Sequence, residues 1–327
     1  MPDLTLSLAM GDYDRTRPIA DGRVKIDGVA PVVMLQSPEE MFFNAFRHQT
    51  CDITELSLSS YCVSLTREDP PYIAVPVFLS RAFRHSAIYI RTDRGIAAPA
   101  DLRGRRIGIA EYQLTANVWA RRILSEFGVA PSDITWLRGG MDTPGRPEKL
   151  RLDPPAGVTI EKAAEGATLN AMLAAGEIDG FIGPRWPRCF AQGHPHVARL
   201  FPDSTAAEAW YAQTRIFPIM HVLGLRQSLA RHHPWLPGAL LKAFSQAKSL
   251  ALAALADTSA SKVTMPFVED TLLRAQSMSS DLWSYGVPGN GPTLEAFLDA
   301  HFEQGLSPRK LTLAELFYPA TYEGFAL

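Results

Sequence analysis

The chain places two arginines and a histidine in one strand-like stretch, Ser80-Arg81-Ala82-Phe83-Arg84-His85-Ser86-Ala87-Ile88-Tyr89-Ile90. Apolar and β-branched residues flank this stretch, and such residues favour extended structure. Because successive side chains of a strand point to opposite faces, the pattern predicts that Arg81, Phe83 and His85 share one face. A cation, an aromatic ring and an imidazole together indicate a site for an anionic aromatic molecule. A salt-bridge cluster at a strand end is the alternative interpretation.

The composition limits the kinds of protein that the chain can be. Its 327 residues suffice for two domains, and its formal net charge is only −2. Basic residues are spread along the sequence, which argues against an extended nucleic-acid-binding surface. The cysteines show neither metal-ligand spacing nor an even-numbered framework, so buried, inert thiols are expected at Cys51, Cys62 and Cys189. This usage is typical of a reducing compartment.

The first ten residues, Met1 to Met10, alternate between apolar and polar positions and carry Asp3 where an export signal would be basic. The alternation predicts a first β-strand rather than a signal peptide. No run of about 18 apolar residues occurs in the sequence, so no membrane span and no membrane partner are expected. A cytoplasmic location is expected.

Polar segments follow the predicted strands of the first part of the chain, at the strand ends where open α/β sheets place their ligands. Arg15 and Arg17 lie in the loop after the first strand. Glu55 and Ser57 belong to a short strand that runs into a hydroxyl-rich turn, where amides and hydroxyls can hold an anion. Glu55 is a candidate acid, base or hydrogen-bond acceptor. The alternatives are a solvated loop for the arginines and a capping carboxylate for Glu55.

Three more predicted strands carry candidate residues in the later part of the chain. Tyr112 and Thr115 occupy a strand-to-helix turn, where backbone amides can face a ligand. Arg185 follows another short strand at its carboxyl end. An apolar strand contains His221, although a lone strand histidine is more often a hydrogen-bonded core residue than a catalyst.

Several well-known motifs are missing from the sequence. It has no Gly-rich dinucleotide loop, no Walker-type motif, no nucleophile elbow and no His-Glu-x-x-His. The histidine pairs at 194/196 and 232/233 lie beside prolines, without a carboxylate or cysteine nearby in sequence. No metal site is expected.

Taken in order, six segments of the chain resemble the 4,5-dihydroxyphthalate decarboxylases. The segments are Gly11 to Arg17, Asp52 to Tyr61, Phe78 to His85, Tyr112 to Thr115, Ile182 to Arg185 and Phe217 to His221. Three tail motifs are also similar: Tyr285-Gly286-Val287, Glu303-Gln304-Gly305-Leu306 and Glu315-Leu316-Phe317. The resemblance runs nearly end to end, and the ordered set is more specific than any single motif.

This resemblance implies a two-lobed periplasmic-binding-protein-like α/β fold of the second type. Each lobe would be a mixed sheet flanked by helices, with the ligand cleft between the lobes. Lobe one would comprise residues 1–88 and 219–327, and lobe two residues 89–218. His85 and His221 then become expected cleft residues.

The resemblance also implies a carboxy-lyase that decarboxylates 4,5-dihydroxyphthalate, or a close hydroxylated aromatic acid, to 3,4-dihydroxybenzoate without an organic cofactor. The partner would be this small aromatic dicarboxylate, and a homo-oligomer is expected. Protonation of the ring needs an acid, for which His85 ranks first and His221 second, while Glu55 would accept a proton from a ring hydroxyl.

The arginines are expected to hold the carboxylate that stays, because a tight grip on the departing one would stabilise the ground state. The candidates are Arg15, Arg17, Arg81, Arg84 and Arg185. The departing carboxylate would lie against apolar surface such as Phe83 or Phe217.

Two rival functions share this fold. A solute-binding protein for an aromatic or dicarboxylic acid would have the same cleft and arginines, and the expected lack of an export signal argues against it. Another enzyme of the fold, such as those of thiamine-precursor or menaquinone synthesis, is the third possibility. The cysteine-rich, iron-linked motif of the thiamine-precursor enzymes is missing from the sequence.

Overall fold

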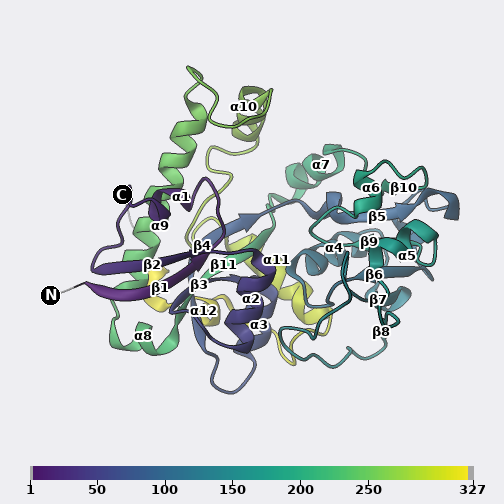
Figure 1. Ribbon diagram of the computed structural model, residues 1–327, viewed down its shortest axis with the longest axis horizontal. Helices are drawn as coiled ribbons and strands as arrows, with labels where there is room; N and C mark the ends of the chain where they lie inside the picture. Colours follow the sequence, from purple (N-terminus) through teal and green to yellow (C-terminus); the bar gives the residue numbers. More distant parts are fainter. Residues whose placement is uncertain (1–2, 323–327) are drawn as a thin grey trace. The chain divides into compact units, whose positions relative to one another are not determined.

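The computed structural model describes residues 3–322 and divides into two compact α/β units (Figure 1). Of the described residues, the first unit contains 3–81, Ile219–Leu294 and 312–322, and the second contains Ala82–Pro218 and Glu295–Leu311. The lobe boundaries expected from the sequence differ from this division in two places. They assign residues 82–88 and 295–311 to lobe one, whereas these residues belong to the second unit.

A five-stranded mixed sheet forms the centre of the first unit. Its strands are β1 (Leu4–Met10), β2 (Val29–Leu35), β3 (Ile53–Ser57), β4 (Tyr72–Arg81) and β11 (Ile219–Arg226). They lie in the order β2-β1-β3-β11-β4, and β11 runs antiparallel to both of its neighbours. The predicted first strand is confirmed from Leu4 to Met10, while Met1 and Pro2 lie outside the described residues.

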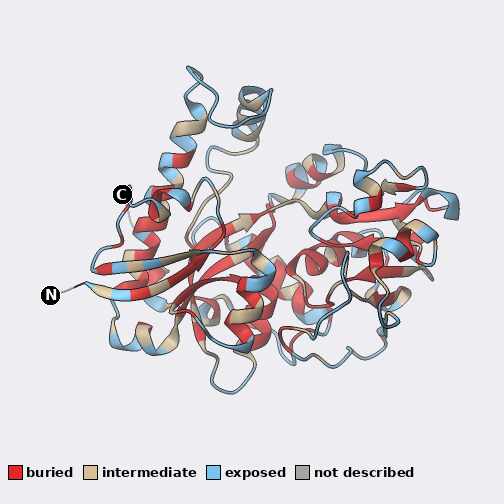
Figure 2. Ribbon diagram, viewed as in Figure 1, coloured by how far each residue is buried: buried red, intermediate tan, exposed pale blue. Residues whose placement is uncertain are grey.

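Helices cover both faces of this sheet. They are α1 (Arg17–Ala20), α2 (Pro38–Arg47), α3 (Leu58–Leu65), α8 (Gln227–His232), α9 (Leu236–Ala256) and α12 (Leu313–Leu316). A further helix, α10 (Val268–Met278), packs on α9 and buries none of its residues. Leu6 and Leu8 of β1 join the core cluster that includes α9. Ala9, on the opposite face of the strand, packs with Met41 and Phe42 of α2. Side chains on both faces of β1 therefore pack against helices, and the strand is buried from Leu8 to Met10 (Figure 2).

The second unit has a six-stranded mixed sheet of its own. Its strands are β5 (Ile88–Arg91), β6 (Arg106–Ile109), β7 (Thr135–Arg138), β8 (Thr159–Lys162), β9 (Gly180–Ile182) and β10 (Val197–Arg199), in the order β10-β5-β9-β6-β7-β8. The α-helices of its segment are α4 (Thr115–Ser125), α5 (Leu169–Ala175), α6 (Arg188–Ala191) and α7 (Thr205–Thr214). A further helix, α11 (Gly291–Glu303), carries the chain from the first unit into the second.

The prediction of one strand through the stretch from Ser80 to Ile90 is wrong. β4 ends at Arg81, a 3₁₀ turn follows at Arg84–Ala87, and β5 begins only at Ile88. His85 lies in this turn and therefore on neither face of a strand. Side chains of a 3₁₀ turn follow a three-residue repeat, whereas those of a strand alternate between two faces. Arg81 belongs to the first unit and His85 to the second.

The prediction about the cysteines agrees with the structure. The three cysteines are free and buried, as expected: Cys51, Cys62 and Cys189. Among residues 3–322, no helix is both long and apolar enough to cross a membrane.

Candidate active site

The candidate site of the first unit centres on a contact between a buried carboxylate and a histidine. His221 Nδ1 lies 2.5 Å from Glu55 Oε1. The Glu55 side chain is 0% exposed, whereas the His221 side chain keeps 16% of its surface exposed. The Phe42 ring meets the imidazole edge-on, with ring centroids 4.8 Å apart. Because Nδ1 donates its hydrogen to Glu55, Nε2 is the nitrogen left to carry and transfer a proton.

The sheet explains why residues so far apart in sequence meet. β3 and β11 pair with His221 opposite Ser57 and Leu223 opposite Glu55. Glu55 is therefore a diagonal neighbour of His221 on the same sheet face. On its other side, β11 pairs with β4 through register shifts on both sides of His221. Such bulges redirect side chains and are common beside active sites.

Three hydrogen-bond donors surround the buried Glu55 carboxylate. Besides His221, the Gly11 amide donates to Oε2 over 3.0 Å and the Tyr13 hydroxyl donates to Oε1 over 3.2 Å. Burial, followed by the charge of Glu55 and the hydrogen bond to it, raises the pKa of Tyr13 well above its ordinary value. The Tyr13 hydroxyl therefore keeps its proton and acts as a donor. These donors replace the water that the carboxylate loses on burial.

Arg15 lies next to this network, between two aromatic rings. Its guanidinium carbon is 4.3 Å from the centroid of the Tyr13 ring and 4.5 Å from that of Trp283. Its Nε donates to the Leu79 carbonyl over 2.7 Å, and Nη1 contacts the Asp14 carboxylate at 3.1 Å. The side chain remains 17% exposed. Arg15 thus lies in the loop that follows β1, and part of its side chain remains in contact with solvent.

Arg81 is buried in the first unit and donates hydrogen bonds to other residues of that unit. It is 6% exposed, and its Nη2 donates to the Ser284 carbonyl over 2.8 Å and to Asn290 Oδ1. Nearby, the Trp283 indole donates to the Phe78 carbonyl over 2.9 Å. These bonds hold the segment that carries Trp283 against β4.

The other predicted residues of the first unit lie in two different settings. Arg17 is half exposed and pairs with Asp12, its Nε donating to Oδ1 over 2.8 Å. Ser57 is buried at the start of α3, opposite His221 in the ladder. Ser57 thus lies near the centre of the network, while Arg17 lies on the surface.

The remaining predicted residues belong to the second unit, where Phe83 and Phe217 stack against each other. Their ring centroids are 4.8 Å apart and the planes are tilted by 32°. Tyr211 meets the Phe83 ring edge-on at 6.1 Å. Phe83 and Phe217 therefore form one apolar surface, although 134 positions separate them in the sequence.

Tyr112, Thr115 and Arg185 lie at strand ends of the second unit, as predicted. Tyr112 is buried under the Arg121 guanidinium, which lies 3.8 Å from its ring centroid. Thr115 is buried and is the first residue of α4. Arg185 follows β9 and is exposed.

His85 is enclosed by aromatic side chains of the second unit. It is 3% exposed, and its ring lies 5.2 Å from Phe201 and 5.6 Å from Trp210, both edge-on. Nδ1 has no hydrogen-bond partner among the described residues. Desolvation by burial lowers the pKa of His85 from 6.5 to about 4, so the imidazole is neutral near pH 7.

We expect His85 to make the fold sensitive to acid. The unfolded chain binds a proton at this histidine near pH 6.5, whereas the folded chain binds it only near pH 4. The free energy of unfolding should therefore fall as the pH drops through this interval, by at most about 3 kcal/mol, and level off below it. Urea unfolding of wild type and His85→Phe at several pH values measures this.

The phenylalanine variant should lose this part of the acid sensitivity, because its ring fits an aromatic surrounding and does not titrate. His232→Gln, which changes an exposed histidine, is the matched control and should retain it. An equal loss of stability with acid in wild type and His85→Phe would contradict the assignment.

Sequence reasoning missed Tyr13, Phe42 and Trp283. Tyr13 lies inside the loop that was singled out for its arginines, so its position at a strand end was the available signal. Trp283 stands two residues before the Tyr285-Gly286-Val287 motif. Nothing in the sequence indicated that Phe42 would contact His221, because that contact depends on how α2 packs on the sheet.

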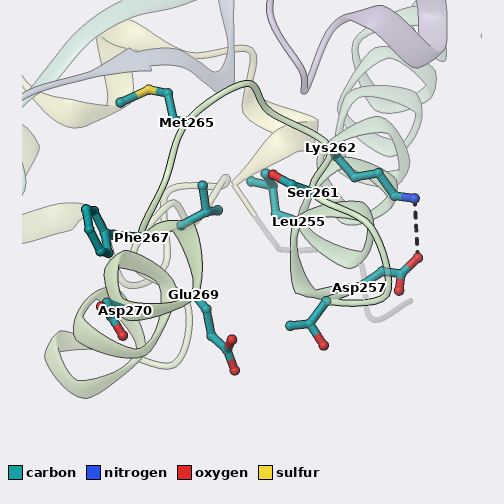
Figure 3. A pocket seen from close by; sticks show the side chains of 10 residues that line it. Leu255, Asp257, Ser261, Lys262, Met265, Phe267, Glu269 and Asp270 are labelled. Atoms are coloured by element: carbon teal, nitrogen blue, oxygen red, sulfur yellow. Dashed lines mark ion pairs between the residues drawn. The ribbon is translucent and has the colours of Figure 1, made fainter.

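A separate hollow of about 340 Å³ lies between the end of α9 and the start of α10 (Figure 3). Its lining contains Met265 and Phe267, together with Lys262, which pairs with Asp257 at 3.4 Å. No residue predicted for the site lines it. Within residues 3–322, no group of three or more histidine, cysteine or acidic side chains is arranged to hold a metal ion.

Comparison with known folds agrees with the two mixed sheets. The family profile described as NMT1/THI5 like matches residues 79–145. The periplasmic aliphatic sulphonate binding protein SsuA from Escherichia coli aligns with a TM-score of 0.53 at 16% sequence identity, covering 100% of this chain and 96% of that chain. The expected periplasmic-binding-protein-like α/β fold is confirmed.

Two curated relatives carry the same name. A "4,5-dihydroxyphthalate decarboxylase" from Pseudomonas putida is 59% identical over 213 residues, which cover 64% of this chain and 83% of the relative. A "4,5-dihydroxyphthalate decarboxylase" from Comamonas testosteroni is 57% identical over 330 residues, which cover 100% of both chains. The chain belongs to the 4,5-dihydroxyphthalate decarboxylase family.

Proposed function

We propose that the protein is a carboxy-lyase that converts 4,5-dihydroxyphthalate to 3,4-dihydroxybenzoate and CO2. Identity of 57% over the full length to a protein named for this activity supports the substrate. The observation that carries the chemistry is the contact of 2.5 Å between His221 Nδ1 and the fully buried Glu55. It provides a partly exposed imidazole whose second nitrogen is available to a substrate.

The proposed substrate suits protonation at carbon. Each carboxylate of 4,5-dihydroxyphthalate has one hydroxyl in the para position, and the molecule is symmetric, so either carboxylate can leave. The para hydroxyl supplies electron density to the carbon that bears the departing group. Protonation of that carbon lets CO2 leave, and the electron pair of the broken carbon–carbon bond restores the aromatic ring.

In this proposal, the proton comes from His221 Nε2. The protonated imidazole gives its proton to the ring carbon and becomes neutral, and solvent returns a proton before the next turnover. One proton is consumed for each CO2 released. General acids of this kind typically contribute about 10²–10⁴-fold to the rate. Glu55 stabilises the protonated imidazole of His221 and orients that imidazole. In this proposal Glu55 is therefore a positioning residue, and it does not accept a proton from a hydroxyl of the substrate.

His221 is therefore the proposed proton donor, although the sequence analysis ranks His85 first for this role. Support for His221 is its exposure of 16% and its carboxylate partner. A pKa of about 4 and enclosure by Phe201 and Trp210 make His85 a poor proton donor near pH 7.

Arg15 is the proposed ligand of the carboxylate that stays. Its guanidinium lies beside the Tyr13–Glu55 pair, and in the described part of the chain Nη2 makes no hydrogen bond. A guanidinium can hold a carboxylate through paired N–H donors. Arg81 then supports the segment around Ser284, which its own hydrogen bonds favour.

The other predicted substrate contacts, the homo-oligomer and the cytoplasmic location stay predictions. The contacts concerned are Arg17, Ser57, Phe83, Tyr112, Thr115, Arg185 and Phe217.

Release of CO2 tests the proposed function. Purified, chelator-treated protein is incubated with 4,5-dihydroxyphthalate, and CO2 and 3,4-dihydroxybenzoate are measured together. We expect both products in equal amounts. Phthalate, which lacks both hydroxyls, is the matched control and should bind without releasing CO2. Tight binding of 4,5-dihydroxyphthalate without CO2 would favour the rival solute-binding function.

A further inference from the structure

We propose that Tyr13 is a positioning residue with two separable functions. Its hydroxyl fixes the Glu55–His221 pair, and its ring, together with Trp283, fixes the guanidinium plane of Arg15. A single side chain would thus set both the proton donor and the carboxylate ligand of the first unit. This inference rests on the proposed function for its kinetic consequences.

The hydroxyl contact acts on the same oxygen that His221 uses. Tyr13 donates to Glu55 Oε1 over 3.2 Å, and His221 Nδ1 lies 2.5 Å from that atom. The Gly11 amide holds the other oxygen, Oε2, over 3.0 Å. With both oxygens held, the carboxylate cannot rotate freely, so the imidazole that bonds to it has one orientation. Loss of the hydroxyl would release one of these restraints.

The ring contact acts on Arg15. Its guanidinium carbon lies at 4.3 Å from the Tyr13 centroid and 4.5 Å from the Trp283 centroid. Both distances are within the range of cation–π attraction. With Nε also bonded to the Leu79 carbonyl, two rings and one hydrogen bond hold the guanidinium in place. An arginine that is held in advance loses less entropy when it binds a carboxylate.

Gly11 gives Tyr13 the room that this position needs. A Cβ atom at Gly11 would lie 2.2 Å from Cζ and 2.4 Å from the hydroxyl oxygen of Tyr13. Nonbonded contacts of a Cβ atom are essentially never this short, so any larger residue at position 11 would displace the Tyr13 ring. The close approach of the ring to the backbone explains the glycine in this loop.

Trp283 is held independently of Tyr13. Its indole donates to the Phe78 carbonyl, the Gly286 amide donates to the Pro76 carbonyl over 2.8 Å, and Arg81 donates to the Ser284 carbonyl. The second wall of the Arg15 site is therefore fixed to β4. The two walls can be changed one at a time.

Tyr13→Phe tests the hydroxyl function, because it retains the ring. We expect kcat for CO2 release to fall about tenfold, the usual effect of losing a hydrogen bond to a charged group. KM should remain near the wild-type value. Tyr72→Phe is the matched control: the Tyr72 hydroxyl is also buried and donates to the Cys51 carbonyl, but it does not contact Glu55. That control should leave kcat unchanged.

Trp283→Leu and Trp283→Phe test the ring function. Leucine removes the aromatic wall and should raise KM several-fold, while phenylalanine retains a ring over Arg15 and should stay close to wild type. Both variants lose the indole hydrogen bond to Phe78, so only a difference between them reports the stacking. Tyr13→Leu should lower kcat and raise KM, and Gly11→Ala should do the same.

Binding of phthalate, measured by calorimetry, separates this inference from the proposed function. If wild type released no CO2, the proposed function would fail, but the ring function would still predict normal phthalate binding by Tyr13→Phe and weak binding by Tyr13→Leu and Trp283→Leu. If wild type is active and Tyr13→Phe changes kcat and KM by the same factor, the inference is overturned. So would equal KM values for the leucine and phenylalanine variants of Trp283.

Discussion

Replacing His221 by glutamine is expected to lower kcat for CO2 release by about 10²-fold or more, the contribution typical of a general acid. Glutamine is polar and has a similar length, and Gly11 and Tyr13 still donate to Glu55, so the carboxylate should stay in place. The amide cannot give a proton to a ring carbon at a useful rate. Binding of phthalate should therefore survive, which isothermal titration calorimetry measures.

His232→Gln is the matched control for this substitution. His232 lies exposed on α8, bonds to the Ser228 carbonyl and makes no contact with Glu55. It should retain wild-type kcat. If His221→Gln bound phthalate and also retained wild-type kcat, His221 would not be the proton donor.

Glu55→Gln is expected to have the second largest effect, a loss in kcat of about 10²-fold with little change in KM. The amide preserves the shape of the side chain but removes the charge that stabilises a protonated His221. It also brings an N–H group to a place where Gly11, Tyr13 and His221 all donate. One donor is then left without an acceptor, at a cost of about 1–3 kcal/mol in the free energy of unfolding.

Loss of activity in Glu55→Gln has to be distinguished from loss of folding. Thermal unfolding shows whether Glu55→Gln is folded at the assay temperature, and Glu55→Asp, which keeps the charge on a shorter side chain, should recover part of the activity. Glu126→Gln is the control, because Glu126 accepts from the Trp210 indole in the second unit. Wild-type kcat in Glu55→Gln would contradict the positioning role of Glu55.

The local patterns of the sequence were enough to predict much of the fold. The alternating residues of the first strand and the strand-to-helix turn at Thr115 occur where they were expected. The stretch around Arg81 was predicted wrongly, because a run of extended residues does not reveal where the chain leaves one unit for another. Here the chain leaves the first unit directly after Arg81 and makes a 3₁₀ turn before it enters the next sheet.

The candidate site was predictable only as separate residues. Arg15 and Glu55 were found because strand ends and their loops are where such sheets place ligands. The contact of Glu55 with His221 was not predictable, since it joins residues 166 positions apart and depends on the β3–β11 register and on the bulge in β11. Trp283 reaches Arg15 only because its segment bonds to β4.

Turnover of 4,5-dihydroxyphthalate in D2O by wild type and His221→Gln, side by side, shows whether His221 delivers the proton to the ring carbon. We expect wild type to release one CO2 per substrate and to form 3,4-dihydroxybenzoate with one deuterium at the ring carbon that CO2 has left. His221→Gln should bind phthalate but form almost no deuterated product. Deuterated product formed by His221→Gln at the wild-type rate would show that another group donates the proton.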